Sequence, residues 1–320
     1  MERHRLLRSR AARREGRRRS GLSPPHRRRR PRGLHPSLAA LLHHRRRGDA
    51  HARLALAREV ARAGRMNPAY SALGLGMRTL GRLSDGIRLG YETGFDSGTM
   101  VDYVYRNEAH GITPLGRAFD RVFLDHPVWE GVRARRRLLI TQLKDSLHRY
   151  SAPVLFDVAA GPGSYLFELP AGDYWAGDIM PAEVARGRAR AERDGRADIR
   201  FVQADAFDSA TWPHPRFDIL VTSGFFDILN DRADLERLMD AGTRATDVGA
   251  RWVWTVMERH TNLALLSATT IDFNKRPWVA TLRSAEDIAK LAEPRGWRVE
   301  RCEREAGRFF AVATMVRATS

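Results

Sequence analysis

The chain has 320 residues, 43% of them hydrophobic, so it can form one large domain or two ordinary domains with a substantial core. Its formal net charge is +17, but residues 1–65 hold 21 arginines and four acidic residues, which account for the whole excess. The remainder is electrically balanced, which removes charge as an argument for nucleic-acid binding there, and the single cysteine, Cys302, excludes intrachain disulfides and cysteine-based zinc sites.

The same composition indicates a cytoplasmic protein. A lone cysteine suits a reducing compartment, and no run approaches the ~18 uninterrupted apolar residues that a membrane helix requires. The nearest apolar stretch, around residues 71–83, is interrupted by Arg78 and Arg82. We therefore expect no membrane span, and we expect no metal site.

Residues 1–65 are predicted to be a disordered, Arg-rich leader, because such a run cannot bury enough apolar surface to fold. Three interpretations compete: an arm that binds nucleic-acid phosphates without sequence preference, an organelle transit peptide, or upstream sequence absent from a native protein that starts at Met66. We favour the third. The segment has few serines and long arginine runs, unlike a transit peptide, and no aromatic residue for base stacking precedes Tyr70.

Residues 66–150 are predicted to form a helical cap or lid region. Apolar residues at helical spacing predict helices over 117–124 and 129–150. Between the breaks lies the glycine- and tyrosine-rich segment 90–111, which begins "GYETGFDSG". Its residues Tyr91, Phe95 and Asp96 could close over a bound ligand and exclude water; the alternative is a segment that only packs against the sheet.

After residue 151 the pattern alternates between short apolar runs and helices. Strands are predicted at 153–160, 173–179, 198–205, 216–223 and 250–257, followed by two strands at 296–303 and 308–316 joined by a short turn. Strands separated by helices imply right-handed crossovers. We therefore predict an α/β fold for 151–320: a Rossmann-like, doubly wound sheet of about seven strands with a terminal antiparallel hairpin.

The first strand leads into the stretch "FDVAAGPGSYLFEL", residues 156–169. Gly161 and Gly163 allow a tight turn and a close approach of the backbone to a ligand. Asp157 lies near the end of the first strand, Asp178 ends the second and Asp205 ends the third. Ligands of open α/β sheets bind beyond the carboxyl ends of the strands, so these carboxylates are predicted to gather at one site.

Two cofactors compete for that site. A dinucleotide enzyme has G-x-G-x-x-G with free amides aimed at the pyrophosphate, whereas this turn has Leu166 at the third glycine position and Pro162 without an amide. Asp157 is also a poor neighbour for a diphosphate. S-adenosylmethionine has no phosphate; it has a cationic amino acid end, a ribose and an adenine, which suit acidic strand ends better. An NAD(P)-dependent Rossmann oxidoreductase remains the alternative.

Residues 153–226 resemble the core of class I S-adenosylmethionine-dependent methyltransferases. The segment 83–121, "LSDGIRLGYETGFDSGTMVDYVYRNEAHGITPLGRAFDR", and the closing "GRFFAVATM" resemble a little-characterised methyltransferase family. Some members of that family are fused to an α/β-hydrolase domain. The hydrolase motif G-x-S-x-G does not occur in this sequence, so we expect only the methyltransferase half, with 151–320 as its cofactor-binding domain.

The resemblance implies roles for the strand ends. Asp178 would bind the ribose hydroxyls, and Asp205 with the backbone of Ala206 would face the adenine. Ser223 and Gly224 would line the pocket near the reacting methyl group. The cofactor-binding residues implied in full are Asp157, Ala159, Gly161, Gly163, Asp178, Ile179, Asp205, Ala206, Ser223 and Gly224.

Methyl transfer is an in-line displacement at a sulfonium, so the protein mainly aligns the reactants. A small-molecule or lipid-like acceptor is expected, and the acceptor itself is not identified. His260 and Tyr91 are candidate catalytic residues, with Glu108 and His110 as further candidate bases. Arginines within 131–137 could hold the cofactor's carboxylate by a bidentate contact. The alternative from another class is a non-catalytic, cofactor-binding regulator.

Overall fold

We describe the protein from a computed structural model. It describes residues 67–229 and 231–319. The predicted leader, residues 1–65, lies outside these ranges. None of the helices in the described ranges is both long and apolar enough to cross a lipid bilayer.

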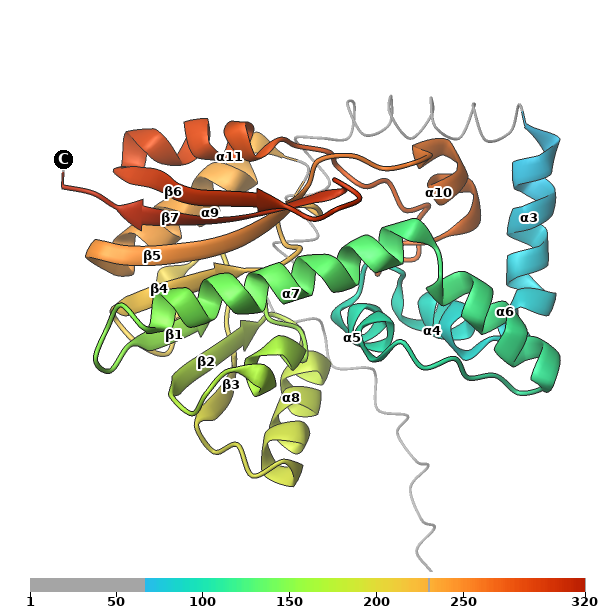
Figure 1. The fold of residues 1–320 in the computed structure, drawn as a ribbon, viewed down its shortest axis with the longest axis horizontal. Coiled ribbons are helices and arrows are strands. Elements are labelled where there is room, and N and C mark those ends of the chain that lie inside the picture. Colours follow the sequence, from blue (N-terminus) through green and yellow to red (C-terminus); the bar gives the residue numbers. More distant parts are fainter. Residues whose placement is uncertain (1–66, 230, 320) are drawn as a thin grey trace, which may run out of the picture. The chain divides into compact units, whose positions relative to one another are not determined.

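The described chain begins with a run of helices up to residue 147, and strands then alternate with helices from residue 154 to residue 257 (Figure 1). The α-helices are α3 (Pro68–Arg78), α4 (Asp85–Thr93), α5 (Gly98–Arg106), α6 (Pro114–Leu124), α7 (Pro127–Leu147), α8 (Pro181–Arg193), α9 (Arg232–Arg244), α10 (Leu263–Thr269) and α11 (Ala285–Ala292). Short 3-10 helices are η1 (Leu80–Leu83), η2 (Ser164–Glu168), η3 (Ser209–Thr211) and η4 (Glu293–Arg295). The strands are β1 (Val154–Asp157), β2 (Asp173–Asp178), β3 (Ile199–Gln203), β4 (Phe217–Thr222), β5 (Thr246–Met257), β6 (Trp297–Arg304) and β7 (Phe310–Arg317).

The seven strands form one sheet in the order β3-β2-β1-β4-β5-β7-β6. Strands β1 to β5 are parallel, whereas β7 is antiparallel to both β5 and β6. The strand order reverses between β1 and β4, which places the crevice that binds ligands in such sheets at the ends of these strands. The predicted doubly wound sheet with a terminal hairpin is confirmed.

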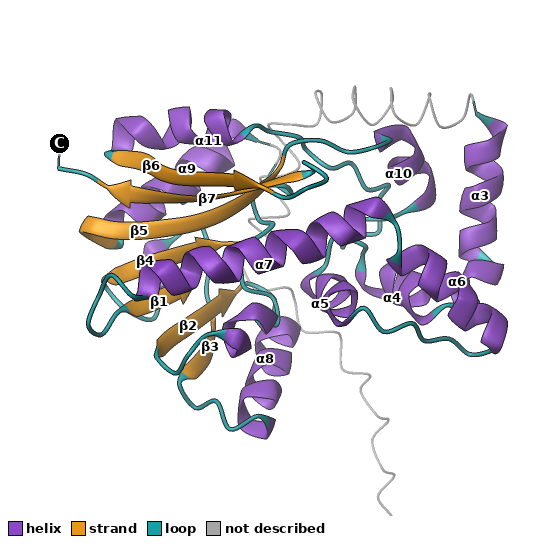
Figure 2. Cartoon of the chain, in the orientation of Figure 1, coloured by secondary structure: helices purple, strands orange, loops and turns teal. Residues whose placement is uncertain are grey.

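Helices cover both faces of the sheet (Figure 2). Alternation along β1 sends Leu155 to the face covered by α7, η2 and α8, and Phe156 to the face covered by α9 and α11. Trp252 and Trp254 lie on the second face and are fully buried, as their spacing on β5 predicts. The sheet is thus a rigid, two-sided core that fixes the positions of its strand ends.

The cap has its own apolar cluster at the carboxyl end of the sheet. Residues of α4, α5 and the first turns of α7 meet Met257 of β5, Phe310 of β7 and Trp278 after α10 in this cluster. Further along α7, Leu139 and Leu143 pack on the sheet instead. Helix α7 therefore belongs to both clusters and runs from the cap across the strands (Figure 1), although the sequence alone placed all of 66–150 in the cap.

Asp120 of α6 organises the cap although it is completely buried. Its carboxylate accepts hydrogen bonds from the Ser84 hydroxyl at 2.5 Å, the Gly86 N–H at 2.8 Å and the His110 N–H at 2.9 Å. The Tyr103 hydroxyl donates a further bond. Because buried polar groups must be hydrogen-bonded, these four donors make Asp120 a structural link between α4, α5 and α6.

The first strand is shorter than predicted, because the chain leaves the sheet after Asp157. The Val158 N–H still bonds to the carbonyl of Val221 at 3.0 Å, and the Ala160 N–H bonds to that of Gly177 at 2.9 Å. These two bonds hold the glycine turn between β4 and β2. The expected helix after the turn is the single 3-10 helix η2.

Candidate functional site

A cleft of about 300 Å³ lies at the carboxyl ends of β1 to β4, between the rim of the sheet and the cap. The sheet contributes polar residues and turns, and the cap contributes mostly apolar and aromatic side chains. Eight of the ten predicted cofactor-binding residues line it: Ala159, Gly161, Asp178, Ile179, Asp205, Ala206, Ser223 and Gly224. The fold therefore brings together residues from four strand ends, as the sequence predicts.

The glycine turn has the conformation that its glycines permit. Gly161 and Gly163 have φ angles of +55° and +60°, in the left-handed region that other residues adopt at a cost. A Cβ atom on Gly163 would lie 3.1 Å from the Phe201 ring. Gly161 lines the cleft, whereas Gly163 does not. Gly163 contributes to the shape of the turn.

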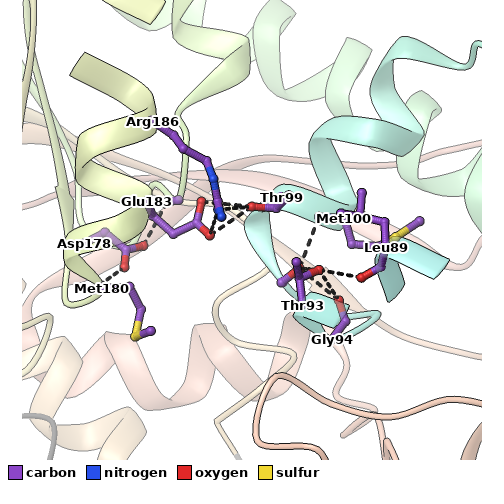
Figure 3. Close-up of polar contacts among 11 residues, drawn as sticks. Leu89, Thr93, Gly94, Thr99, Met100, Asp178, Met180, Glu183 and Arg186 are labelled. Atoms are coloured by element: carbon purple, nitrogen blue, oxygen red, sulfur yellow. Dashed lines mark hydrogen bonds and ion pairs between the residues drawn. The ribbon is translucent and has the colours of Figure 1, made fainter. Parts of the chain in front are cut away.

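Asp178 is fixed at the rim by the glycine turn. Its Oδ2 accepts the Gly161 N–H at 2.9 Å. Its Oδ1 accepts the Met180 N–H at 2.8 Å (Figure 3). Each carboxylate oxygen can accept a second bond, so both remain able to receive ligand hydroxyls. Burial raises the pKa of Asp178 to about 6, although its two backbone donors act in the opposite direction.

Asp157 lies beneath the cleft, not in its wall, and is completely buried. The Tyr165 hydroxyl donates to its Oδ2, while its Oδ1 has no hydrogen-bond partner among the described residues. Burial raises the pKa of Asp157 to about 7, and the nearby charge of Asp178 adds to that shift. Asp157 is therefore placed to brace the turn through Tyr165, which does line the cleft.

Asp205 and Gly224 complete the polar rim. Asp205 Oδ1 accepts the Phe207 N–H at 2.9 Å, which orients the carboxylate at the end of β3. Gly224 has a φ of +73°, and its N–H donates to Thr255 Oγ1 at 2.8 Å. A Cβ atom on Gly224 would lie 3.3 Å from Nη1 of Arg135, so the turn after β4 leaves space beside that guanidinium.

Of the arginines within 131–137, the structure brings Arg135 to the cleft. It is buried on α7, and its Nη1 lies 3.5 Å from Asp227 Oδ2. Its Nη2 lies 3.4 Å from the Tyr105 hydroxyl, and the guanidinium lies 4.8 Å from the centre of the Phe310 ring. Its Nε has no hydrogen-bond partner in the described chain. These long contacts leave the cation incompletely satisfied.

Most of the charged side chains that line the cleft are acidic. Among the described residues that line it, Arg135 is the only cationic side chain, whereas seven lining residues are acidic. Asp227 is one of these and was missed by the sequence analysis. Burial raises its pKa, and its Oδ1 accepts the Met257 N–H at 2.6 Å. The available signal was an acidic residue inside the apolar run "FFDIL" directly after β4.

Helix α5 of the cap lies directly on the glycine turn. A Cβ atom on Gly98 would come within 2.8 Å of Pro162 Cδ and 3.1 Å of Gly161 Cα. Thr99 donates to Glu183 Oε1 at 3.0 Å, and Arg186 pairs with the same carboxylate at 2.6 Å (Figure 3). The cap thus contacts the sheet half of the protein at the predicted ligand site.

The two predicted catalytic residues do not line the cleft. Tyr91 is buried in the cap, where its hydroxyl donates to the Thr269 carbonyl at 2.5 Å. His260 Nδ1 accepts the Asn262 N–H at 3.1 Å, and burial lowers its pKa to about 4. Glu108 and His110 also lie outside the cleft. Phe95 and Asp96 do line it, so part of the predicted lid segment borders the ligand space.

A family model described as "Putative methyltransferase" matches residues 33–317, most of the chain. The chain belongs to this family. The match confirms the resemblance drawn from the segments at 83–121 and 307–315. The match starts inside the Arg-rich segment, so the matched range includes residues 33–65, which the sequence predicts to lie outside the folded protein.

A relative of the chain is Uncharacterized protein YnbC of Escherichia coli K12. The two are 29% identical over 266 residues, which are 78% of this chain and 45% of YnbC. The chain therefore spans less than half the length of this relative.

Two solved structures share the fold. One is a possible exported protein from Bordetella parapertussis, with a TM-score of 0.54, 20% identity, and coverage of 68% of this chain and 79% of that chain. The other is magnesium protoporphyrin IX methyltransferase from Synechocystis PCC 6803 with bound S-adenosylhomocysteine. Its TM-score is 0.51 with 15% identity, covering 71% of this chain and 98% of that one. This chain thus has a class I methyltransferase fold.

Proposed function

We propose that this protein transfers a methyl group from S-adenosylmethionine to an acceptor bound between the sheet and the cap. The observation that supports this most is the grouping of Asp178, Asp205 and the glycine turn along one cleft at the switch point of the sheet. Membership of a methyltransferase family and the class I fold agree with it.

The lining suggests how the cofactor would be held. Asp178 would accept the ribose hydroxyls, and Asp205 with Ala206 would face the adenine. The amino acid end would lie over the glycine turn toward Ser223 and Gly224. There Arg135, the incompletely satisfied buried cation, would bind the cofactor's carboxylate, because charge-assisted hydrogen bonds to guanidinium suit a carboxylate.

The same charges argue against the alternative dinucleotide. A diphosphate would bring two negative charges into a cleft that, within residues 67–229 and 231–319, already has seven acidic lining residues and a single arginine. The cationic sulfonium and ammonium of S-adenosylmethionine meet a favourable field instead. We therefore do not propose the NAD(P)-dependent oxidoreductase.

A catalytic role is favoured over a regulatory one because the cleft extends past Gly224 into the cap, where Trp129, Phe273 and Trp278 line it. If the cap closed the cleft around the cofactor's methyl group, no acceptor could reach it, and a cofactor-binding regulator would be favoured. The cofactor supplies an activated methyl group on sulfonium, so the chain's own task is to bind, orient and exclude water. Neither Tyr91 nor His260 is proposed as catalytic, because neither reaches this space.

Calorimetric titration with S-adenosylhomocysteine tests the proposal. The parent is expected to bind, and Asp178→Asn is expected to bind at least tenfold more weakly, which corresponds to about 1.4 kcal/mol. Asp173→Asn is the matched control, because Asp173 starts the same strand at its other end and pairs with Arg200 on the surface. No binding by the parent, or equal affinity of both variants, contradicts the proposed cofactor site.

A further inference from the structure

The cap half of the cleft differs in chemistry from the rim half. Beside polar cap residues such as Asp96, it has a continuous set of apolar side chains: Val101 of α5, Trp129 and Val132 of α7, Phe273 and Trp278 of the segment after α10, and Phe310 of β7. We call these six residues the apolar chamber. Trp129, Val132, Trp278 and Phe310 are buried in the structure, so the chamber is a formed cavity wall and not an exposed surface.

The chamber adjoins the place where the proposed function puts the reacting methyl group. Arg135 lies over the Phe310 ring on one side and beside Gly224 on the other. A molecule in the chamber would therefore approach the end of β4 from the cap, opposite the side that the adenosine would occupy at Asp178 and Asp205.

The charges around the chamber select against anions. Asp96 and Asp227 border the same cleft, and both are buried or half-buried. Arg135, the single cation among the described residues that line the cleft, already faces Asp227, and in the proposed function it also holds the cofactor's carboxylate. An anionic acceptor would thus lose its hydration without gaining a counter-charge, which is costly in a buried site.

From these observations we propose that the methyl acceptor is an apolar, non-anionic molecule whose ring or acyl chain fills the apolar chamber and whose hydroxyl group faces the sulfonium. The O–C bond to the methyl group forms as the S–C bond breaks, S-adenosylhomocysteine leaves, and the hydroxyl proton passes to one of the carboxylates that border the cleft. The proposal rests on the proposed function, because it assigns the acceptor side of the same cleft. Aromatic side chains offer flat apolar area for either a ring or a chain. Phosphorylated and carboxylated acceptors are excluded by the same argument.

Matched pairs of probes test this acceptor class on the protein saturated with S-adenosylhomocysteine. Dissociation constants are measured by tryptophan fluorescence for 2-naphthol against 2-naphthoate, and for 1-decanol against decanoate. At least one neutral probe is expected to bind at least tenfold more tightly than its anionic partner; the two pairs distinguish a ring from a chain. Equal or tighter binding of the anions, or binding of none of the four, overturns the proposal.

A variant with a larger side chain in the apolar chamber tests whether the neutral probe binds there. Val101→Phe is expected to weaken the preferred neutral probe at least tenfold and to leave the affinity for S-adenosylhomocysteine within twofold. Val122→Phe is the control, because Val122 lies on α6 with 73% of its surface exposed and does not line the cleft. Unchanged probe affinity in Val101→Phe overturns the chamber. Absence of S-adenosylhomocysteine binding in the parent refutes the proposed function instead, and the probes are then titrated without it.

Discussion

Asp157 and Asp178 end neighbouring strands, but their environments give the two carboxylates different roles. Asp178 is half-buried at the rim, with two backbone donors and capacity for ligand hydroxyls. Asp157 is sealed under the turn, and its contact with Tyr165 makes it part of the support of the cleft. The sequence presents both as acids at strand ends, and only burial separates a ligand-binding group from a bracing group.

The raised pKa of Asp157 predicts a pH-dependent stability. Between the unfolded pKa of about 4 and the folded value of about 7, the folded protein keeps a proton that the unfolded chain has released. The contribution of this proton to the free energy of unfolding is therefore complete below about pH 4. It is lost as the pH rises to about 7. Asp157→Asn is expected to remove this decline, on the order of 1 to 4 kcal/mol. Urea denaturation of both proteins at pH 5 and pH 8 measures it.

Comparing the parent with Asp157→Asn separates the effect of Asp157 on stability from that of His260. The lowered pKa of His260 makes the protein more stable, not less, as the pH rises. The stability that neutral His260 contributes is present above its unfolded pKa and is lost as the pH falls toward about 4. If the parent and Asp157→Asn differ in stability by the same amount at both pH values, Asp157 does not hold the proton.

Arg135 is expected to contribute to binding of the cofactor's amino acid end and not of its adenosine. Arg135→Gln is expected to weaken S-adenosylhomocysteine about 10- to 100-fold, because a hydrogen bond to a charged group contributes about 1.5–3 kcal/mol. The affinity for 5′-methylthioadenosine, which lacks the amino acid end, is expected to stay within threefold. Arg133→Gln on the same helix is the control, because Arg133 pairs with Glu130 away from the cleft. Equal weakening of both ligands would assign Arg135 a structural role.

The proposed cofactor site depends on the contact between helix α5 and the glycine turn. Gly98 can approach Pro162 closely because it has no Cβ, and Thr99 and Glu183 join the two elements beside it. Phe95 and Asp96 on the preceding loop also border the cleft. Helix α5 is therefore the part of the cap best placed to cover the cofactor.

Gly98→Ala should disturb this contact. The added Cβ would lie 2.8 Å from Pro162 Cδ, so the helix must shift away from the turn. We expect at least a fivefold faster release of S-adenosylhomocysteine in stopped-flow measurements. Gly76→Ala is the control: a Cβ there meets nothing within 4 Å, and the better helix propensity of alanine should stabilise α3 by up to about 1 kcal/mol. The same release rate in both variants would show that α5 does not retain the ligand.

At the scale of the whole molecule, α7 joins the two parts of the site. Its first turns contribute Trp129 and Val132 to the apolar chamber, and its later turns pack on the sheet. Arg135 lies between these two regions of the helix. The position of the cap over the strand ends is thus fixed by a continuous 21-residue helix, which also sets the distance between the proposed acceptor and cofactor sites.

The Arg-rich segment provides a test at the same scale. A chain that starts at Met66 is expected to bind S-adenosylhomocysteine within twofold of the full chain, because the cleft residues named here all follow it. Calorimetry and the melting temperature of both proteins measure this. A tenfold loss of affinity would show that residues 33–65, which the family match includes, belong to the functional unit.

The sheet and its polar rim could be predicted from local sequence patterns. Period-two apolar runs, two glycines and acids at strand ends are local signals, and the carboxyl ends of parallel strands necessarily meet at one edge. Asp178, Asp205 and Gly224 could therefore be predicted to meet before any coordinates. Tyr91 and His260 could not be judged in the same way, because nothing local shows whether an irregular segment points toward the cleft or away from it.

Contacts between residues far apart in the sequence became visible only in the folded protein. Arg135 on α7 and Asp227 after β4 are 92 positions apart, and only packing of the cap on the sheet brings their charges together in the cleft. The apolar chamber likewise draws on α5, α7, the segment after α10 and β7, which no sequence period relates. Local chemistry specified the proposed cofactor side of the cleft, whereas long-range packing specified the proposed acceptor side.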